Sequence, residues 1–434
     1  MSFARLVFVL LLLAPAVGRA NPDIQHWKLK NGVRVLFVES HELPMVRVRV
    51  IFDAGSARDE PGKEGQALLT NHLLSDGTAT LDEDAVAQRF DSLGADLSTN
   101  VDRDMATIGL RSLSKKELLS PALETLRQLL MAPAFPAGGL ERERGRMLVG
   151  FAQRAQSPDS VANRAFFHAL YGNHPYAHRT VGTPESVRGI KREDLENFYK
   201  RYYVGGNALL VMVGDLKKSE AQRIARTLVG SLPKGERAPK LPPVPDLKKA
   251  VTRDIVFPST QTHVLVGAPG VYRGDPDYFP LYVGNYILGG GGLVSRLSTE
   301  VREKRGLSYS VYSYFYPLRV KGPFVAGLET RTKQRLNALR VLRETMARFI
   351  EKGPTEEELV AAKRHITGGF PLRIDTSGKV ADYLSVIGFY RLPLDYLDEF
   401  NRRVEAVTVK QIADAFRRRL DPKRMVTVTV GAKG

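Results

Sequence analysis

The chain contains 434 residues, of which 43% are hydrophobic and 26% are charged, and it carries a formal net charge of +17. This composition is ordinary for a folded globular protein with about two to three domains' worth of core, and it excludes a largely disordered chain. Cysteine is absent, which excludes structural disulfides and a lipid anchor on cysteine. Basic residues alternate with acidic ones, as in the ERER run at 141–144, so we interpret them as solvated helix faces and expect no nucleic-acid partner.

Residues 1–20 have the layout of a secretory signal peptide. Arg5 supplies an early positive charge, an apolar run covers residues 6–14, and Gly18 and Ala20 are the small residues expected at the −3 and −1 positions of the cleavage site. The apolar run is shorter than the roughly 20 residues of a membrane span. Export of a cysteine-free chain predicts a bacterial periplasmic protein with no stable membrane anchor once the signal is removed.

The remaining chain predicts two similar halves in succession. In the first half, β-branched alternation predicts strands, and amphipathic periodicity predicts helices that begin with one at 66–74. The predicted strands are 33–38, 45–52 and those within 95–112, and the further predicted helices are 82–93, 115–130, 138–155 and 159–170. In the second half, strands are predicted at 263–270, 309–318 and 323–330, and helices at 276–288, 332–352 and 355–369.

An internal repeat relates the two halves. Residues 187–214 and 404–431 each read as a helix followed by a strand, at a constant offset of 217 that pairs Tyr199 with Phe416 and Gly214 with Gly431. Residues 234–249 contain four prolines without periodicity and read as a linker. We therefore predict an α+β fold of two duplicated domains, at 21–233 and 250–434, in which each mostly antiparallel sheet is packed with helices.

The stretch from Gly289 to Tyr309 opens with four glycines and continues with an amphipathic helix pattern, which a further glycine, Gly306, is expected to end. Arg302 lies in the last helical turn and Tyr309 lies just beyond the break. A guanidinium and a phenol at this spacing can both direct hydrogen-bond donors at one substrate oxygen. The competing interpretation is a solvated arginine and a half-buried strand tyrosine.

No complete catalytic constellation stands out from the residues themselves. His174 and His178 are four apart, but Pro175 and a Gly-Asn turn place them in a loop rather than on a helix, which disfavours a zinc pair. There is no Walker-type glycine loop, and the glycine run at 289–292 follows a helix rather than a strand, which disfavours dinucleotide binding. No serine has a Gly-x-Ser-x-Gly setting.

The duplicated halves and the GGGGLVSRLSTEVREKRGLSYS stretch resemble the insulinase/pitrilysin-type zinc peptidases, the inverzincins, over nearly the whole mature chain. The resemblance implies the LuxS/processing-peptidase-like metallopeptidase fold. It also places the family's inverted zinc motif, His-x-x-Glu-His, on the helix at 66–74. There Leu68 replaces the first zinc histidine, Asn71 replaces the general-base glutamate, and His72 alone remains. The third ligand, a glutamate in the family, falls at Gly150 or Val149.

A chain with this degenerate motif is expected to bind no metal and to cut no peptide alone, because zinc hydrolysis needs three protein ligands and a base. Arg302 and Tyr309 match the family's arginine and tyrosine seven residues apart, and the resemblance gives them the role of binding the scissile carbonyl and stabilising the oxyanion. In two-chain bacterial members one subunit carries the zinc motif and its partner carries this pair.

The resemblance therefore predicts the zinc-less subunit of a periplasmic heterodimeric metallopeptidase, with a zinc-bearing homologous subunit and a peptide substrate as partners. The peptide is expected to add as a strand to a sheet edge. One alternative is a catalytically inactive peptide-binding or assembly scaffold of the same fold, and another is a homodimer that recruits metal through other residues.

Overall fold

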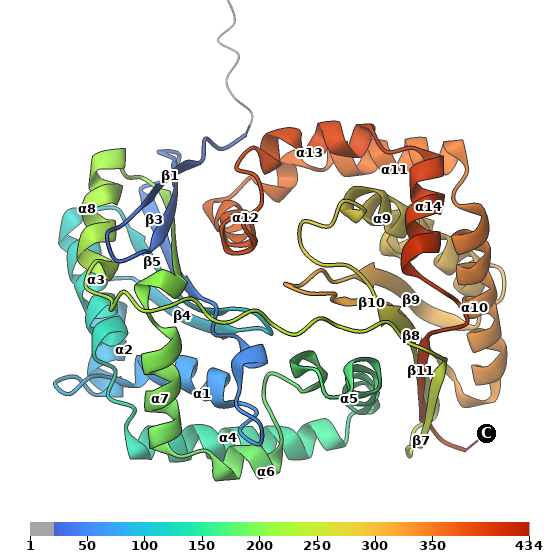
Figure 1. Cartoon of the computed structure of the whole chain (residues 1–434), viewed down its shortest axis with the longest axis horizontal. Coiled ribbons are helices and arrows are strands. Elements are labelled where there is room, and N and C mark those ends of the chain that lie inside the picture. The colour runs from blue at the N-terminus through green and yellow to red at the C-terminus, as the bar shows by residue number, and fades with distance from the viewer. Residues whose placement is uncertain (1–20, 434) are drawn as a thin grey trace, which may run out of the picture.

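The computed structural model describes residues 21–433, and the predicted signal peptide lies outside them. Two β-sheets, each backed by helices, form the two halves of the molecule (Figure 1). In the first sheet the strand order is β1-β2-β6-β3-β5-β4, with β2 and β6 parallel and the other neighbours antiparallel. The strands are β1 Gln25–Lys28, β2 Arg34–Glu39, β3 Met45–Phe52, β4 Asp96–Val101, β5 Ala106–Leu113 and β6 Ala208–Gly214.

The second sheet repeats the first. Its order is β7-β11-β8-β10-β9, again with one parallel pair, β7 and β11, so that β9 occupies the edge position that β4 has in the first half. Its strands are β7 Val251–Val256, β8 Gln261–Pro269, β9 Ser308–Phe315, β10 Pro323–Arg331 and β11 Val426–Gly431. The predicted fold class, two duplicated α+β halves with mostly antiparallel sheets, is confirmed.

The helices follow the predicted periodicity closely. Those of the first half are α1 Gln66–His72, α2 Glu83–Ser92, α3 Lys116–Met131, α4 Ala137–Ala155, α5 Pro158–Tyr171, α6 Pro184–Gly189, α7 Arg192–Tyr202 and α8 Lys218–Val229. Those of the second half are α9 Tyr278–Asn285, α10 Arg335–Lys352, α11 Glu356–Gly368, α12 Ser377–Tyr390, α13 Tyr396–Glu405 and α14 Val409–Arg419. Among the described residues, no helix is long and apolar enough to cross a membrane.

Each half lends one helix to the other. Helix α5 of the first half packs on the second sheet, where Phe166 and Leu170 join a core that contains Leu265 and Val428. Helix α12 of the second half packs on the first sheet in the same way, through residues that form one core (Leu36, Val38, Ile51, Leu209, Val211, Val213, Val380, Ala381, Leu384 and Phe389). Both helices lie between the two sheets in Figure 1.

Glycines permit these close approaches. A Cβ at Gly267 on β8 would lie 2.7 Å from the Phe166 ring, and a Cβ at Gly388 on α12 would lie 2.7 Å from Leu209. Burial of this apolar surface stabilises the pair of halves at roughly 25 cal/mol per Å². The exchanged helices therefore make the two halves one packed body.

Residues 234–249 form neither helix nor strand, yet they are held against the first half. The Lys234 carbonyl accepts a hydrogen bond from the Gly206 N–H at 2.6 Å, Arg58 Nη1 donates to the Pro239 carbonyl at 2.7 Å, and Leu241 and Val244 are buried. Figure 1 shows this segment crossing between the halves as an extended strip. It is extended but firmly attached.

Asp104 connects the halves through buried hydrogen bonds. Its carboxylate lies at the tip of the β4–β5 hairpin and accepts from the Tyr176 hydroxyl at 2.5 Å, the Tyr390 hydroxyl at 2.8 Å and the Arg319 backbone N–H at 2.8 Å. Tyr390 ends α12 and Arg319 lies between β9 and β10, so a single carboxylate of the first half ties down two segments of the second. A buried anion with three donors is well satisfied, and its loss leaves two phenols without an acceptor.

Asp104→Ala is expected to lower the free energy of unfolding by about 2–4 kcal/mol, because the hydroxyls of Tyr176 and Tyr390 lose a buried acceptor. Urea unfolding followed by circular dichroism measures this. The matched control is Asp91→Ala, at an exposed aspartate of α2, which should change stability by no more than about 0.5 kcal/mol. Equal effects of the two substitutions would contradict the role of Asp104.

A buried aspartate positions the start of α1. Asp59 accepts hydrogen bonds from the backbone N–H groups of Gly65 at 2.8 Å and Ala67 at 2.7 Å. These N–H groups lie at the helix N-terminus, where no carbonyl of the helix can accept from them. His178 Nε2 lies 3.4 Å from the Asp59 carboxylate and 2.8 Å from the Ser56 carbonyl. Burial alone would lower the pKa of His178, but the hydrogen bond to Asp59 and its charge outweigh burial and raise that pKa.

The raised pKa of His178 predicts a pH-dependent part of the stability. Protonated His178 is favoured in the folded state, so its stabilisation is fully present below the unfolded-state pKa of 6.5 and is lost as pH rises through the higher folded-state pKa. The stability advantage of the wild-type chain over His178→Gln should therefore shrink as pH rises from 6.5 through the higher folded-state pKa. Urea unfolding of both chains across this range measures it, and parallel stability curves would contradict it.

Candidate functional site

Arg302 and Tyr309 lie together at the start of β9. Arg302 belongs to a short π-helical segment, η7 Ser298–Glu303, and the turn after it closes at Gly306, which has a φ of +58°. The guanidinium carbon of Arg302 lies 4.8 Å from the centroid of the Tyr309 ring, which is the geometry of a cation–π contact. Tyr309 is 84% exposed, so the predicted half-buried alternative for this tyrosine does not describe it.

Arg302 keeps its guanidinium free of acidic partners in the described part of the chain. Its segment contains two acids. Glu300 is already engaged by Lys304 at 2.7 Å and Arg305 at 2.7 Å, and Glu303 forms no ion pair with Arg302. Arg348 adds a third cation at 3.7 Å from the same carboxylate. With Glu300 saturated, the donors of Arg302 remain available, and Tyr309 offers a phenol beside them.

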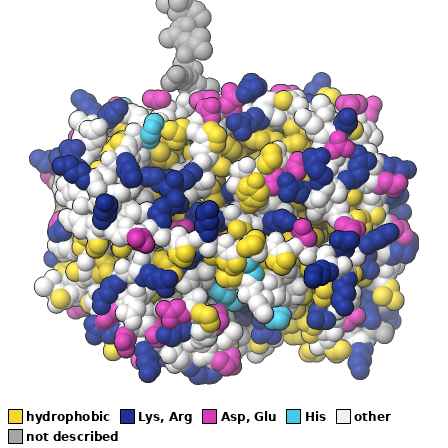
Figure 2. All heavy atoms as spheres, viewed as in Figure 1, with side chains coloured by type: hydrophobic (Ala, Val, Ile, Leu, Met, Phe, Trp, Pro, Cys, Tyr) yellow, Lys and Arg dark blue, Asp and Glu magenta, His cyan; other side chains and the backbone are white. Residues whose placement is uncertain are grey.

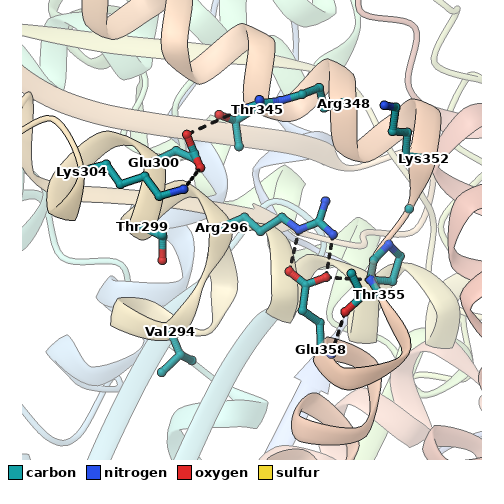
Figure 3. A pocket seen from close by; sticks show the side chains of 12 residues that line it. Val294, Arg296, Thr299, Glu300, Lys304, Thr345, Arg348, Lys352, Thr355 and Glu358 are labelled. Atoms are coloured by element: carbon teal, nitrogen blue, oxygen red, sulfur yellow. Dashed lines mark hydrogen bonds and ion pairs between the residues drawn. The ribbon is translucent and has the colours of Figure 1, made fainter.

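A cavity of about 530 Å³ lies behind η7 (Figure 3), and it belongs to the support of this segment. Arg296 forms a two-pronged ion pair with Glu358 at the N-terminus of α11, with both N–O distances at 2.6 Å. The cavity is lined by Glu300 and Lys304 of η7 and the following turn, but not by Arg302 or Tyr309. Its ion pairs fasten the π-helical segment to α10 and α11 rather than extend the Arg302–Tyr309 site.

The glycine run before η7 brings backbone close to β9. A second π-helical turn, η5 Tyr286–Gly290, continues α9, and a Cβ at Gly289 would lie 2.6 Å from the Ser313 backbone nitrogen. Only glycine fits so close to the strand. The run then leaves Leu293 and Val294 exposed on the surface. The predicted helix at 276–288 is thus an α-helix only to Asn285, and the π-turn completes it.

The positions of the family zinc motif have become packing positions. Leu68 is partly buried against the first core, and Asn71 is fully buried with its Nδ2 donating to the Tyr203 hydroxyl at 3.2 Å. Asn71 Oδ1 is buried without a hydrogen-bond partner. Burial lowers the pKa of His72, opposed by the charge of Glu143 on α4. His72 and Glu143 are therefore neighbours, although the sequence pattern did not single out Glu143.

The third ligand position is closed by a cation. A Cβ at Gly150 would lie 2.9 Å from Arg154 Nη1, and that nitrogen is buried without a hydrogen-bond partner. Val149, the other candidate, is 60% exposed on α4. Within residues 21–433 no group of three or more His, Cys, Asp or Glu side chains could hold a metal ion. The residues present do not fit a catalytic zinc, which needs three protein ligands.

The two sets of site residues lie in different halves. Arg302 and Tyr309 belong to the second half and Leu68, Asn71, His72 and Gly150 to the first, and no hydrogen bond, ion pair or ring contact between the two sets occurs in the described chain. The pair is not assembled over the degenerate motif. Sequence reasoning missed Arg154 and Glu143, whose only signal was their spacing on α4 relative to Gly150.

Basic side chains are spread over the face of the molecule seen in Figure 2, with acidic side chains among them. The ion pairs on helices show the same mixing, for example Arg340 with Glu344 and Arg417 with Asp414. These are exposed pairs that contribute little stability each.

Comparison with known proteins covers both halves. Residues 34–184 match the model described as "Insulinase (Peptidase family M16)", and residues 189–366 match "Peptidase M16 inactive domain". A crystal structure described as a peptidase M16 inactive domain from Pseudomonas fluorescens is similar with a TM-score of 0.92 and 40% identity, over 95% of this chain and 98% of that one.

Two further relatives have lower identity. The Helicobacter pylori protein named "Non-peptidase homolog YmxG" is 27% identical over 94% of each chain. The periplasmic protease PqqL from Escherichia coli shares the fold with a TM-score of 0.77 and 17% identity, and this chain covers 48% of its length. The duplicated fold, the two family models and the 40% identity over nearly the full length lead to one conclusion. The chain belongs to peptidase family M16, the insulinase family.

Proposed function

We propose that this chain is the non-hydrolytic subunit of a heterodimeric zinc metallopeptidase of the periplasm, in which a homologous partner chain holds the zinc. The observation that carries the proposal is the asymmetry between its two candidate sites. Leu68 stands at a zinc position, Asn71 stands at the general-base position, and the glycine at the third ligand position is covered by Arg154, whereas Arg302 and Tyr309 remain side by side with Tyr309 exposed. The name of the Helicobacter pylori relative, a non-peptidase homolog, supports the first part.

The Arg302–Tyr309 pair has the chemistry needed to bind a carbonyl that is becoming an oxyanion. Guanidinium donates without accepting, and the Tyr309 phenol donates without adding charge. Donors of this kind act by holding charge that develops in the transition state. In the complex, Arg302 and Tyr309 orient the scissile carbonyl, while the partner supplies the metal and the base. The two halves of PqqL in one chain support the idea that M16 units act in pairs.

In the assembled complex, Tyr309→Phe is expected to lower kcat by about 100-fold, because one oxyanion donor is removed without any change in packing of an exposed side chain. Peptide cleavage by the purified complex measures the rate, and size-exclusion chromatography confirms unchanged assembly. Tyr272→Phe, at another exposed tyrosine, is the matched control and should retain full activity. Equal activities for wild type and Tyr309→Phe would favour the alternative of a scaffold.

Arg302→Lys should also impair turnover, because an ammonium cannot reproduce the planar donor fork. Arg305→Lys provides the control on the same helix end, since Arg305 pairs with Glu300 and faces no substrate in the proposal. The expected order of kcat is wild type and Arg305→Lys together, followed by Arg302→Lys. A loss in Arg305→Lys as large as in Arg302→Lys would indicate a structural effect on η7 instead.

The chain purified without its partner should carry far less than one zinc per chain, because only His72 of the family ligands remains. Inductively coupled plasma mass spectrometry after dialysis measures the metal, with His72→Ala as the comparison. No EDTA-sensitive peptide cleavage is expected from the chain alone. Stoichiometric zinc that disappears in His72→Ala would overturn the zinc-less assignment, and so would robust cleavage by the isolated chain.

A further inference from the structure

A groove of about 540 Å³ runs between helix α9 and the outer edge of strand β9. Residues 310–317 form one wall, and the other wall consists of α9 side chains (Tyr278, Leu281, Tyr282 and Asn285). The glycine run at Gly289–Gly292 lines the groove beside Asn285, and Arg273 lines it beyond the carboxyl end of β9. There the Arg273 backbone N–H donates to the Leu318 carbonyl at 2.8 Å.

Strand β9 presents unpaired backbone groups to this groove. It pairs only with β10, and the Tyr316 N–H donates to the Pro323 carbonyl at 2.9 Å. The backbone N–H and C=O groups of even-numbered residues therefore point toward β10, and those of odd-numbered residues point away from it. Asn285 Nδ2 occupies one outward carbonyl, that of Ser313, at 2.9 Å. The outward N–H and C=O groups of Val311 and Phe315 and the Ser313 N–H have no hydrogen-bond partner in the described chain. This row spans about 13 Å and is a template for one more strand.

Arg273 lies at the end of this row of outward backbone groups, and its guanidinium has no ion-pair partner among the described residues. Its guanidinium carbon lies 5.7 Å from the Tyr390 ring centroid, and its Nε is buried without a hydrogen-bond partner. The acids that follow it in sequence are held elsewhere, Asp275 by Arg419 at 2.7 Å and Asp277 by Arg418 at 2.6 Å. Within residues 21–433 no carboxylate forms an ion pair with Arg273. A guanidinium in this state is suited to take a carboxylate through two parallel hydrogen bonds.

The internal repeat relates this groove to the region of the degenerate zinc motif. By their order in the chain and in the sheets, α9 corresponds to α1, and β9 corresponds to the edge strand β4. The helix-and-edge-strand groove beside the family motif thus has a counterpart in the second half. In the second half, Arg273 lies beyond the end of the edge strand, and α9 carries no histidine, cysteine, aspartate or glutamate.

We propose that the α9–β9 groove binds the carboxyl-terminal segment of an extended peptide, which adds as a strand to β9 and places its α-carboxylate on Arg273. With the carboxylate at the Arg273 end, the peptide runs parallel to β9. Main-chain hydrogen bonds provide affinity with little demand on side-chain identity, and the guanidinium selects a free carboxyl terminus. This inference deepens the function proposed above by naming the peptide end that this chain recognises, but the binding requires no partner subunit.

Fluorescence anisotropy with an amino-terminally labelled peptide of about seven β-prone residues tests the assignment of Arg273 on the isolated mature chain. Amidation of the peptide carboxyl terminus is expected to weaken binding to the wild-type chain by roughly tenfold, because a charge-assisted hydrogen bond is lost. Arg273→Gln should bind both peptides with the weaker affinity. Arg226→Gln, at an exposed arginine on α8, should retain the tenfold preference. Thermal unfolding confirms that both variants are folded.

A second series of peptides tests strand addition without altering the protein. Methylation of single peptide nitrogens should weaken binding at alternate positions and leave the intervening positions unaffected, because only every second residue of an added strand donates to β9. Loss at every position alike, or at none, would overturn strand addition. Equal affinity for the free and amidated peptides would overturn the role of Arg273, and absence of binding would overturn both.

The outcomes separate this inference from the proposed peptidase role. Peptide binding by the isolated chain together with normal turnover by the Tyr309→Phe complex would leave the groove intact and reject the oxyanion role. If turnover by the complex depends on Tyr309 but the isolated chain binds no peptide, the oxyanion role would stand and the groove proposal would be rejected.

Discussion

The reciprocal packing of α5 and α12 is the constraint on which the rest of the structure depends. Each sheet has one face covered by helices of its own half and the other face covered by a helix of the opposite half. Separating the halves would expose both apolar faces at once and break the Asp104 hydrogen bonds to the Tyr390 hydroxyl and the Arg319 N–H. Opening within the chain is therefore costly. Under the proposed function, the motion that admits a peptide is one between this chain and its partner, and not between its own halves.

A rigid pair of halves gives fixed positions to the groups that face outward. Arg302 sits on a π-helical segment that is held by the Arg296–Glu358 ion pair and by the saturated Glu300, and Tyr309 sits on a strand paired with β10. Sites on well-packed elements keep their donors in place without reorganisation. Strand β9, which carries Tyr309 near its start, also lines the α9–β9 groove, so the proposed carbonyl binding and the proposed strand addition would share one element.

Many of the strands and helices and the duplication could be predicted from the sequence, and the features that could not be predicted have physical reasons. Alternation predicted the strands, and the offset of 217 predicted the duplication, because both depend on local periodicity. Periodicity predicted the helix at 159–170, but amphipathicity does not say which sheet an apolar face will meet. The π-helical geometry at 298–303 is too short to be distinguished from an α-turn by side-chain pattern. The cover of Gly150 by Arg154 depends on a rotamer and is invisible in composition.

The fate of the two sites differs in a way that stability alone does not explain. Leu68 and Asn71 now contribute packing and a hydrogen bond to Tyr203, which is what a position gains when it no longer serves chemistry. Tyr309 gains nothing comparable, since it is almost fully exposed and touches mainly the guanidinium of Arg302. An exposed cation–π contact is worth only about 0.5–1 kcal/mol. The fold gains little stability from this contact, which agrees with the role proposed for the pair toward a ligand from outside the chain.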